Sequence, residues 1–206
     1  MKRLVIPGEI LSEKQLRMDH AVVEEGKTCS TIIGLFDDQA NSLIPVEGLW
    51  YPRPGEKVIG IVEDAKLNTD VIALNAPYKG LVISKFTDSN MVTGDIIEAT
   101  VKDMDKTGTI ILIRPKVLYG GKVLAIRPSK VHRVLGKGDS MIGQIAEGTK
   151  ASISVGMNGL VWVKGGDSDT ATDAIMRIQE ESHVPGLTER IAKMVGAQPR
   201  QQQAQQ

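Results

Sequence analysis

The chain has 206 residues with 25 basic and 25 acidic side chains, and only 3% of its residues are aromatic. Its single cysteine, Cys29, excludes a disulfide framework within the chain and is expected to be a buried thiol. Residues 1–6 hold too short an apolar run for a signal peptide, and no run approaches the roughly 20 apolar residues of a membrane span. These features predict a soluble, cytoplasmic protein.

Residues 1–53 consist of short apolar runs between turn signals, which predicts a small N-terminal β domain. The turn signals are Pro7-Gly8, Gly26, Asp37-Asp38 and Asn41-Ser42. The prolines at positions 52 and 54 then form a stiff connector. Trp50 lies beside this connector and is a candidate anchor for docking on a partner.

Residues 54–121 contain five strand-like runs in a span the size of an OB-type barrel. The runs are 57–62, 70–75, 80–84, 95–103 and 109–113. Gly108, in the tight turn before the last run, supplies the positive φ that a short hairpin loop needs. A five-stranded antiparallel barrel is therefore expected.

From residue 122 the expected elements follow the order β-α-α-β-β-α, which is that of a type I KH domain. They are a strand at 122–126, a helix with Ser129 as N-cap, a helix at 140–146 ended by Gly148, strands at 151–155 and 160–164, and a helix at 170–182. A last amphipathic helix is expected at 187–195. The fold class is thus mainly β with an α+β C-terminal part.

Two glycine-containing segments of this region need separate interpretations. Gly156-Met157-Asn158-Gly159 lies between two strands and is interpreted as a structural turn, in which Asn158 and Gly159 adopt positive φ. Gly136-Lys137-Gly138-Asp139 occupies the place of the Gly-x-x-Gly loop with which KH domains hold RNA, but its fourth residue is Asp. Asp139 would repel phosphate, or it caps the following helix. Either role weakens ordinary KH clamping.

Positive charge gathers in residues 106–138, which contain eight Lys or Arg and no Asp or Glu. Such segregation predicts a surface that faces a polyanion, although the same side chains could also be scattered around a barrel and a helix. Within it, Lys130, Arg133 and Lys137 are the expected phosphate contacts of the KH region.

In the barrel, the candidate RNA contacts are loop or strand-end residues, namely Lys66, Tyr78, Lys79 and Lys106. Tyr78 could stack on a base or pack under its own loop, and both possibilities remain open. Trp162 alternates with Val161 and Val163, so it is expected in a core or a domain interface.

Catalysis is not expected from these residues. The histidines at positions 20, 132 and 183 are far apart and lack metal-ligand spacing. The sequence contains no Walker-type loop and no Gly-x-Ser-x-Gly motif. No catalytic residue, metal site or cofactor is predicted.

Several motifs in one order resemble the RNA-binding cap subunit of the archaeal exosome. They are Val5-Ile6-Pro7-Gly8-Glu9, Tyr51-Pro52-Arg53-Pro54-Gly55, Asn75-Ala76-Pro77-Tyr78 and Gly156-Met157-Asn158-Gly159. The resemblance implies an N-terminal β domain at 1–53 that docks on a ring, an S1/OB RNA-binding domain at 54–121, a KH domain at 122–197 and a disordered Gln-rich tail at 198–206.

The resemblance also implies a function without chemistry. Three copies of such a subunit sit on a hexameric ring of phosphorolytic exosome subunits and guide single-stranded, adenine-rich RNA into its pore. Two alternatives stay open at this stage. One is a structural adaptor with little RNA affinity of its own, and the other is a free-standing S1/KH RNA-binding protein.

Overall fold

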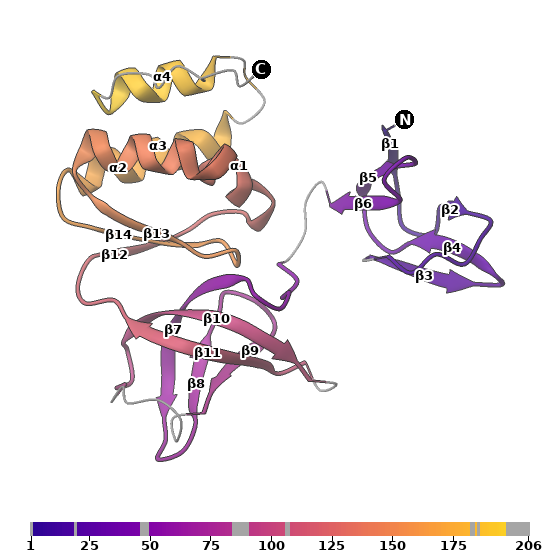
Figure 1. Cartoon of the computed structure of the whole chain (residues 1–206), viewed down its shortest axis with the longest axis horizontal. Coiled ribbons are helices and arrows are strands. Elements are labelled where there is room, and N and C mark those ends of the chain that lie inside the picture. The colour runs from indigo at the N-terminus through magenta and orange to yellow at the C-terminus, as the bar shows by residue number, and fades with distance from the viewer. Residues whose placement is uncertain are drawn as a thin grey trace. The chain divides into compact units, whose positions relative to one another are not determined.

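The computed structural model describes residues 2–18, 20–45, 50–83, 91–105, 108–181, 184 and 186–196. The chain separates into two compact units, Met1–Leu49 and Trp50–Gln206. The described elements of the first unit are all strands, and the second unit holds a barrel followed by a sheet with helices (Figure 1). This arrangement confirms the predicted fold class.

The first unit consists of two three-stranded antiparallel sheets. One sheet has the order β1 (Lys2–Val5), β5 (Gly34–Asp37), β6 (Ser42–Pro45), and the other has the order β2 (Ile10–Ser12), β4 (Lys27–Ser30), β3 (Ala21–Glu24). The core of the unit is small and is built from Val5, Leu11, Phe36 and Leu43. Cys29 is a buried free thiol, as predicted.

Five strands of the second unit form a closed barrel with the order β10-β11-β9-β8-β7. They are β7 (Lys57–Ala65), β8 (Asp70–Ala73), β9 (Lys79–Val82), β10 (Ile96–Met104) and β11 (Ile110–Val117). The expectation of purely antiparallel pairing was wrong at one place, since β11 pairs parallel to β9. β10 pairs with β7 rather than β9, and this pairing closes the barrel.

Alternate residues of the strands fill the barrel, as the two-residue period of a strand requires. Ile97, Ala99 and Val101 of β10 are buried in it. Trp50 is also buried there, and its indole Nε1 donates to Glu56 Oε2 at 2.9 Å. The interpretation of Trp50 as a docking anchor was therefore wrong, because its indole ring packs in the core of the barrel.

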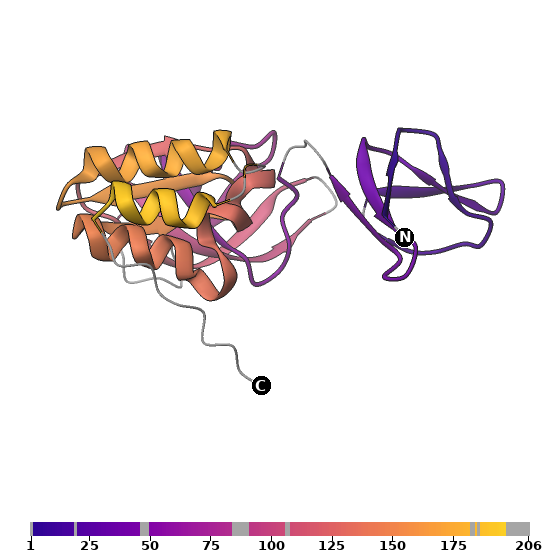
Figure 2. The same cartoon turned by 90° about the horizontal axis from the view of Figure 1, so that it is seen from above.

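The remaining strands form an antiparallel sheet with the order β12-β14-β13, namely β12 (Lys122–Ala125), β14 (Leu160–Lys164) and β13 (Ser152–Val155). The helices α1 (Val131–Leu135), α2 (Ser140–Thr149) and α3 (Ser168–Glu180) lie on one face of this sheet (Figures 1 and 2). α4 (Leu187–Met194) packs on α2 and α3. The order β-α-α-β-β-α confirms the type I KH topology.

Two predicted helix ends of this region were wrong. Ser129 is not an N-cap, because the chain passes through a 3₁₀ turn at Pro128–Lys130 and α1 begins only at Val131 without a side-chain cap. Gly148 does not end α2, which continues to Thr149. A Cβ at Gly148 would lie 2.4 Å from the carbonyl oxygen of Val195, so this glycine allows the end of α4 to approach. None of the described helices is long and apolar enough to cross a membrane.

Candidate nucleic-acid interface

The turn Gly156-Met157-Asn158-Gly159 joins the KH region to the barrel. Asn158 is completely buried, and its amide Nδ2 donates to the carbonyl oxygens of Ile59 and Leu74, each at 2.7 Å. Its Oδ1 accepts the backbone N–H of Ile59 at 3.3 Å. Asn158 does not have the positive φ predicted for it, whereas Gly159 does, at 83°.

The turn forms hydrogen bonds with backbone groups of β7 that point away from β10, at positions where β8 does not pair with β7. Val62 and Glu56 of the β7 segment bond with residues of the β10 segment, so by antiparallel alternation Ile59 and Lys57 direct their backbone groups to the other side. On that side β8 begins to pair only at Ile61. Asn158 bonds Ile59, and the N–H of Met157 donates to the carbonyl oxygen of Lys57 at 2.8 Å. The KH turn thus continues the ladder beyond the end of β8.

Apolar and charged side chains extend the same junction. Ile59, Leu118, Leu160 and Trp162 form one buried cluster between barrel and sheet. Glu98 of β10 accepts from the Ser154 hydroxyl and pairs with Lys57 at 3.3 Å. The predicted interface position of Trp162 is confirmed. Barrel and KH region are therefore held together by backbone, amide and apolar contacts.

The loop at Gly136-Lys137-Gly138-Asp139 has a different character. Its side chains at Lys137 and Asp139 are exposed, and both Gly138 and Asp139 are left-handed, with φ of 59° and 58°. Asp139 occupies the N-cap position of α2, but its side chain makes no capping hydrogen bond. An N-cap side chain reaches the helix N–H groups from extended backbone, which Asp139 does not have. The capping interpretation was wrong, and the carboxylate remains exposed.

Three candidate phosphate contacts lie in this loop or in the helix before it. Lys130 and Arg133 are three residues apart at the start of α1, a spacing that places neighbours on one helical face, and Lys137 follows in the loop. Arg133 and Lys137 are exposed and Lys130 is half-buried, whereas Val131 and Val134 face the core. Among the described residues, none of the three cations is paired with a carboxylate.

Other cations of residues 106–138 are placed differently. Lys122 pairs with Asp169 at 2.7 Å, and hydrogen bonding to that carboxylate raises the pKa of the lysine. Arg114 and Lys116 are exposed on β11, where Arg114 has a φ of 53° at an irregularity in the pairing with β10. Lys106 lies outside the described residues.

The barrel candidates have partners within the barrel. Lys66 pairs with Asp64 at 3.1 Å, and Lys79 pairs with Glu63 at 2.7 Å. Tyr78 is half-buried against the barrel core, and a Cβ at Gly108 would lie 3.2 Å from its ring. Of the two possibilities left open for Tyr78, the structure favours packing under its loop.

The most exposed ring among the described residues is one that the sequence interpretation did not single out. Tyr119 follows β11 and is 73% exposed. It lies within the acid-free residues 106–138, next to Gly120 and Gly121, so the signal was present. An aromatic side chain between a basic strand and a pair of glycines is a candidate for base stacking.

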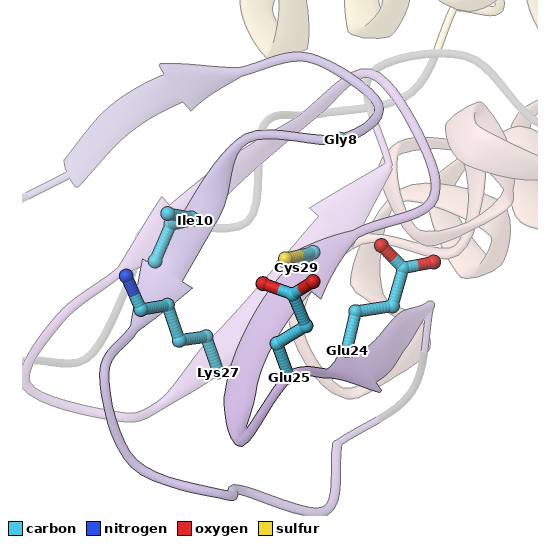
Figure 3. A pocket seen from close by; sticks show the side chains of 6 residues that line it. All are labelled: Gly8, Ile10, Glu24, Glu25, Lys27 and Cys29. Atoms are coloured by element: carbon cyan, nitrogen blue, oxygen red, sulfur yellow. The ribbon is translucent and has the colours of Figure 1, made fainter.

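The described residues offer no catalytic constellation. No group of three or more His, Cys, Asp or Glu side chains among them could hold a metal ion. A cavity of about 560 Å³ in the first unit is lined by Gly8, Ile10, Glu24, Glu25, Lys27 and Cys29 (Figure 3). Its charged side chains come from β3, β4 and the turn between them, and Cys29 is buried, so no activated nucleophile is assembled.

Comparisons with known proteins place this geometry in a family. Residues 121–169 match the family model of the KH domain. The chain is 36% identical over 218 residues to the exosome complex component Rrp4 of Pyrococcus abyssi, covering 94% of this chain and 82% of that protein. It is 30% identical to the Rrp4 component of Saccharolobus solfataricus, covering 94% and 88%.

A solved structure agrees with these relatives. A crystal structure of a protein assigned as an exosome complex RNA-binding protein superposes with a TM-score of 0.65 at 28% identity. The match covers 72% of this chain and 96% of that one.

Proposed function

Because the chain belongs to the Rrp4 family of exosome components, we propose that it is a non-catalytic RNA-binding subunit that caps a hexameric ring of phosphorolytic exosome subunits. In this proposal three copies sit on the ring, in the cytoplasm, and guide single-stranded, adenine-rich RNA towards its pore. The observation that carries RNA binding is the group of cations at Lys130, Arg133 and Lys137, which have no carboxylate partners among the described residues.

The charges at this interface predict how RNA binding depends on salt and how tightly a phosphate is held. Cations that neutralise phosphates release counterions, so affinity falls as salt rises. The exposed carboxylate of Asp139 beside these cations disfavours a tight clamp on one phosphate. The proposed site therefore attracts an RNA strand without holding it in one register, which suits a subunit that passes RNA onward.

The test measures binding of the full chain to fluorescently labelled oligo(A) at several salt concentrations. We expect the slope of log affinity against log salt to be clearly negative, at about 0.7 per phosphate neutralised. Replacing Lys130, Arg133 and Lys137 together with alanine is expected to weaken binding at least 10-fold at low salt and to flatten the slope by about two units. A flat salt response of the wild-type chain contradicts the proposal.

A matched triple variant controls for net charge. Lys14 and Lys27 are exposed cations of the first unit and Lys193 is an exposed cation of α4, and their replacement with alanine removes the same charge. We expect this variant to bind within about threefold of wild type. Replacing Lys66 and Lys79, whose charges are shared with Asp64 and Glu63, is expected to have an intermediate effect.

The structural adaptor stays the second candidate, and an observation in the first unit favours its docking role. Leu4 of β1 and Leu35 of β5 are cross-strand partners, yet they are 63% and 40% exposed. Adjacent exposed apolar side chains are typical of a surface that binds protein. Co-purification with ring subunits but no oligo(A) affinity in the isolated chain would favour the adaptor. Absence of ring binding would favour a free-standing RNA-binding protein.

A further inference from the structure

Tyr119 is the most exposed aromatic side chain among the described residues, at 73%. It follows the last barrel strand and precedes Gly120, Gly121 and β12, so it lies where the barrel passes into the KH region. No hydrogen bond or ring contact from the described part of the chain engages it. A large ring in this position is available to a ligand.

The backbone that carries this ring is fixed on both sides. Before it, Leu118 is buried, and its N–H donates to the carbonyl oxygen of Ile96 at 2.8 Å. After it, the indole Nε1 of Trp162 donates to the carbonyl oxygen of Gly120 at 2.7 Å. A Cβ at Gly121, which has a φ of 83°, would lie 2.6 Å from the carbonyl oxygen of Val163. The loop is therefore packed against β14, and little backbone freedom would be lost on binding.

Two lysines belong to the strands β11 and β14, which adjoin the loop that carries the ring. Lys116 is exposed on β11, where its cross-strand partner is Glu98, and Tyr119 follows it by three residues along the chain. Lys164 ends β14, and its Cε would lie 3.7 Å from a Cβ at Gly120, so its side chain runs beside the loop. Neither lysine is paired with a carboxylate among the described residues.

Carboxylates on the adjoining segments are already engaged. Asp169 pairs with Lys122 at 2.7 Å, and Asp95 accepts the N–H of Val92 at 2.9 Å. Asp167 accepts the N–H of Thr170 at 3.0 Å. Glu98, the cross-strand partner of Lys116, pairs with Lys57 at 3.3 Å, so lysines balance the charges of both Glu98 and Asp169. Asp95 and Asp167 keep their charge, but backbone N–H groups hold both carboxylates in place. Lys116 and Lys164 are left as cations that form no ion pair among the described residues.

We infer that Tyr119 stacks on a base of single-stranded RNA at the barrel–KH junction, and that Lys116 and Lys164 bind the phosphates beside that base. An aromatic face flanked by cations is the common way in which proteins bind single strands without reading sequence. A protein partner is less favoured by the same surroundings, since lysine is depleted from the cores of protein interfaces. The inference rests on the proposed RNA-binding function and assigns it a stacking residue.

The test compares variants of the full chain in binding to oligo(A) over a series of salt concentrations. Tyr119→Ala is expected to weaken binding about 5- to 100-fold at every salt concentration, because stacking is lost without any change of charge. Tyr119→Phe keeps the ring face and is expected to bind within about twofold of wild type. Lys164→Ala is expected to reduce the salt slope by about 0.7.

A second readout reports stacking directly. Oligo(A) with 2-aminopurine substituted for adenine should lose fluorescence on binding wild type and Tyr119→Phe, and lose less on binding Tyr119→Ala at saturating protein. Because the ring is exposed, all three proteins are expected to share one melting temperature.

The outcomes separate the two proposals. If the wild-type chain does not bind oligo(A), the proposed function and this inference both fail. If wild type binds with the expected salt slope but Tyr119→Ala matches it in affinity and fluorescence, RNA binding stands and the stacking role of Tyr119 is overturned. That second result would also be obtained if Tyr119 instead contacts a protein subunit.

Discussion

Two glycine-containing segments of the KH region, 136–139 and 156–159, resemble each other in sequence and differ in environment. In the second, Asn158 is fully buried and bonded to Ile59 of β7 and to Leu74, the residue that follows β8. In the first, Lys137 and Asp139 are exposed. Glycine spacing alone therefore does not identify the segment that meets RNA. The partners of the residues between the glycines distinguish a structural turn from a binding loop.

The glycines themselves serve the two segments differently. A Cβ at Gly156 would lie 2.6 Å from the backbone nitrogen of Ile59, so this glycine permits contact between the turn and the barrel. A Cβ at Gly138 would meet nothing within 4 Å, and this residue is glycine at a φ of 59° in an exposed loop. One glycine allows close packing, and the other allows an unusual backbone conformation.

The largest effect is expected from Asn158. Asn158→Ala would leave the backbone groups of Ile59 and the carbonyl oxygen of Leu74 buried without these partners, so we expect a loss of about 3 kcal/mol or more in the free energy of unfolding. Urea denaturation of wild type and Asn158→Ala measures this loss in the free energy of unfolding. The exposed Asn68, replaced with alanine, is the control and should change stability by less than about 0.5 kcal/mol. Equal midpoints for both variants would show that the turn does not hold the barrel.

The next largest effect is expected from Asp139, in the exposed 136–139 loop. Asp139→Asn removes the carboxylate while keeping a residue that tolerates left-handed backbone, and we expect oligo(A) affinity to rise about 3- to 10-fold at low salt. Asp139→Gly is expected to give the same gain. Fluorescence anisotropy at two salt concentrations measures both variants. If affinity is unchanged, the 136–139 loop lies away from the RNA.

The smallest effect concerns Asp167, which caps α3. Hydrogen bonds from Thr170 lower the pKa of this carboxyl below its ordinary value, so the ionised form stabilises the folded state. That contribution is present above the ordinary pKa and is lost as pH falls through the lowered one. Asp167→Asn keeps a capping oxygen but does not titrate there. Melting temperatures measured between pH 6 and 2 should therefore converge towards acid, and parallel curves would contradict this assignment.

Much of the fold could be predicted because local patterns and tertiary structure agree. The five barrel runs and the β-α-α-β-β-α order follow from apolar periodicity and turn residues, which report which side of an element faces a core. The strand at Leu160–Lys164 has the predicted bounds. The predicted caps at Ser129 and Asp139 failed, because a cap depends on backbone angles that residue type alone does not determine.

The candidate site could be predicted only in outline. The acid-free residues 106–138 were visible from residue types, and so were Lys130, Arg133 and Lys137. Which cations have partners was not visible, because Asp169 is distant in sequence from Lys122, as Glu63 is from Lys79. The exposure of Tyr119 and the partial burial of Tyr78 also follow from packing rather than from residue type.

By itself the sequence determined the order of elements, the absence of acidic residues from 106–138 and the presence of a turn at 156–159. Periodicity, charge and turn preference are local properties, so they can be read along the chain. Only the tertiary structure decided that Asn158 completes the β7 ladder, that Tyr119 is more exposed than Tyr78, and which lysines are neutralised. Those outcomes depend on which distant segments meet, and the partners of each group arise only when the chain has folded.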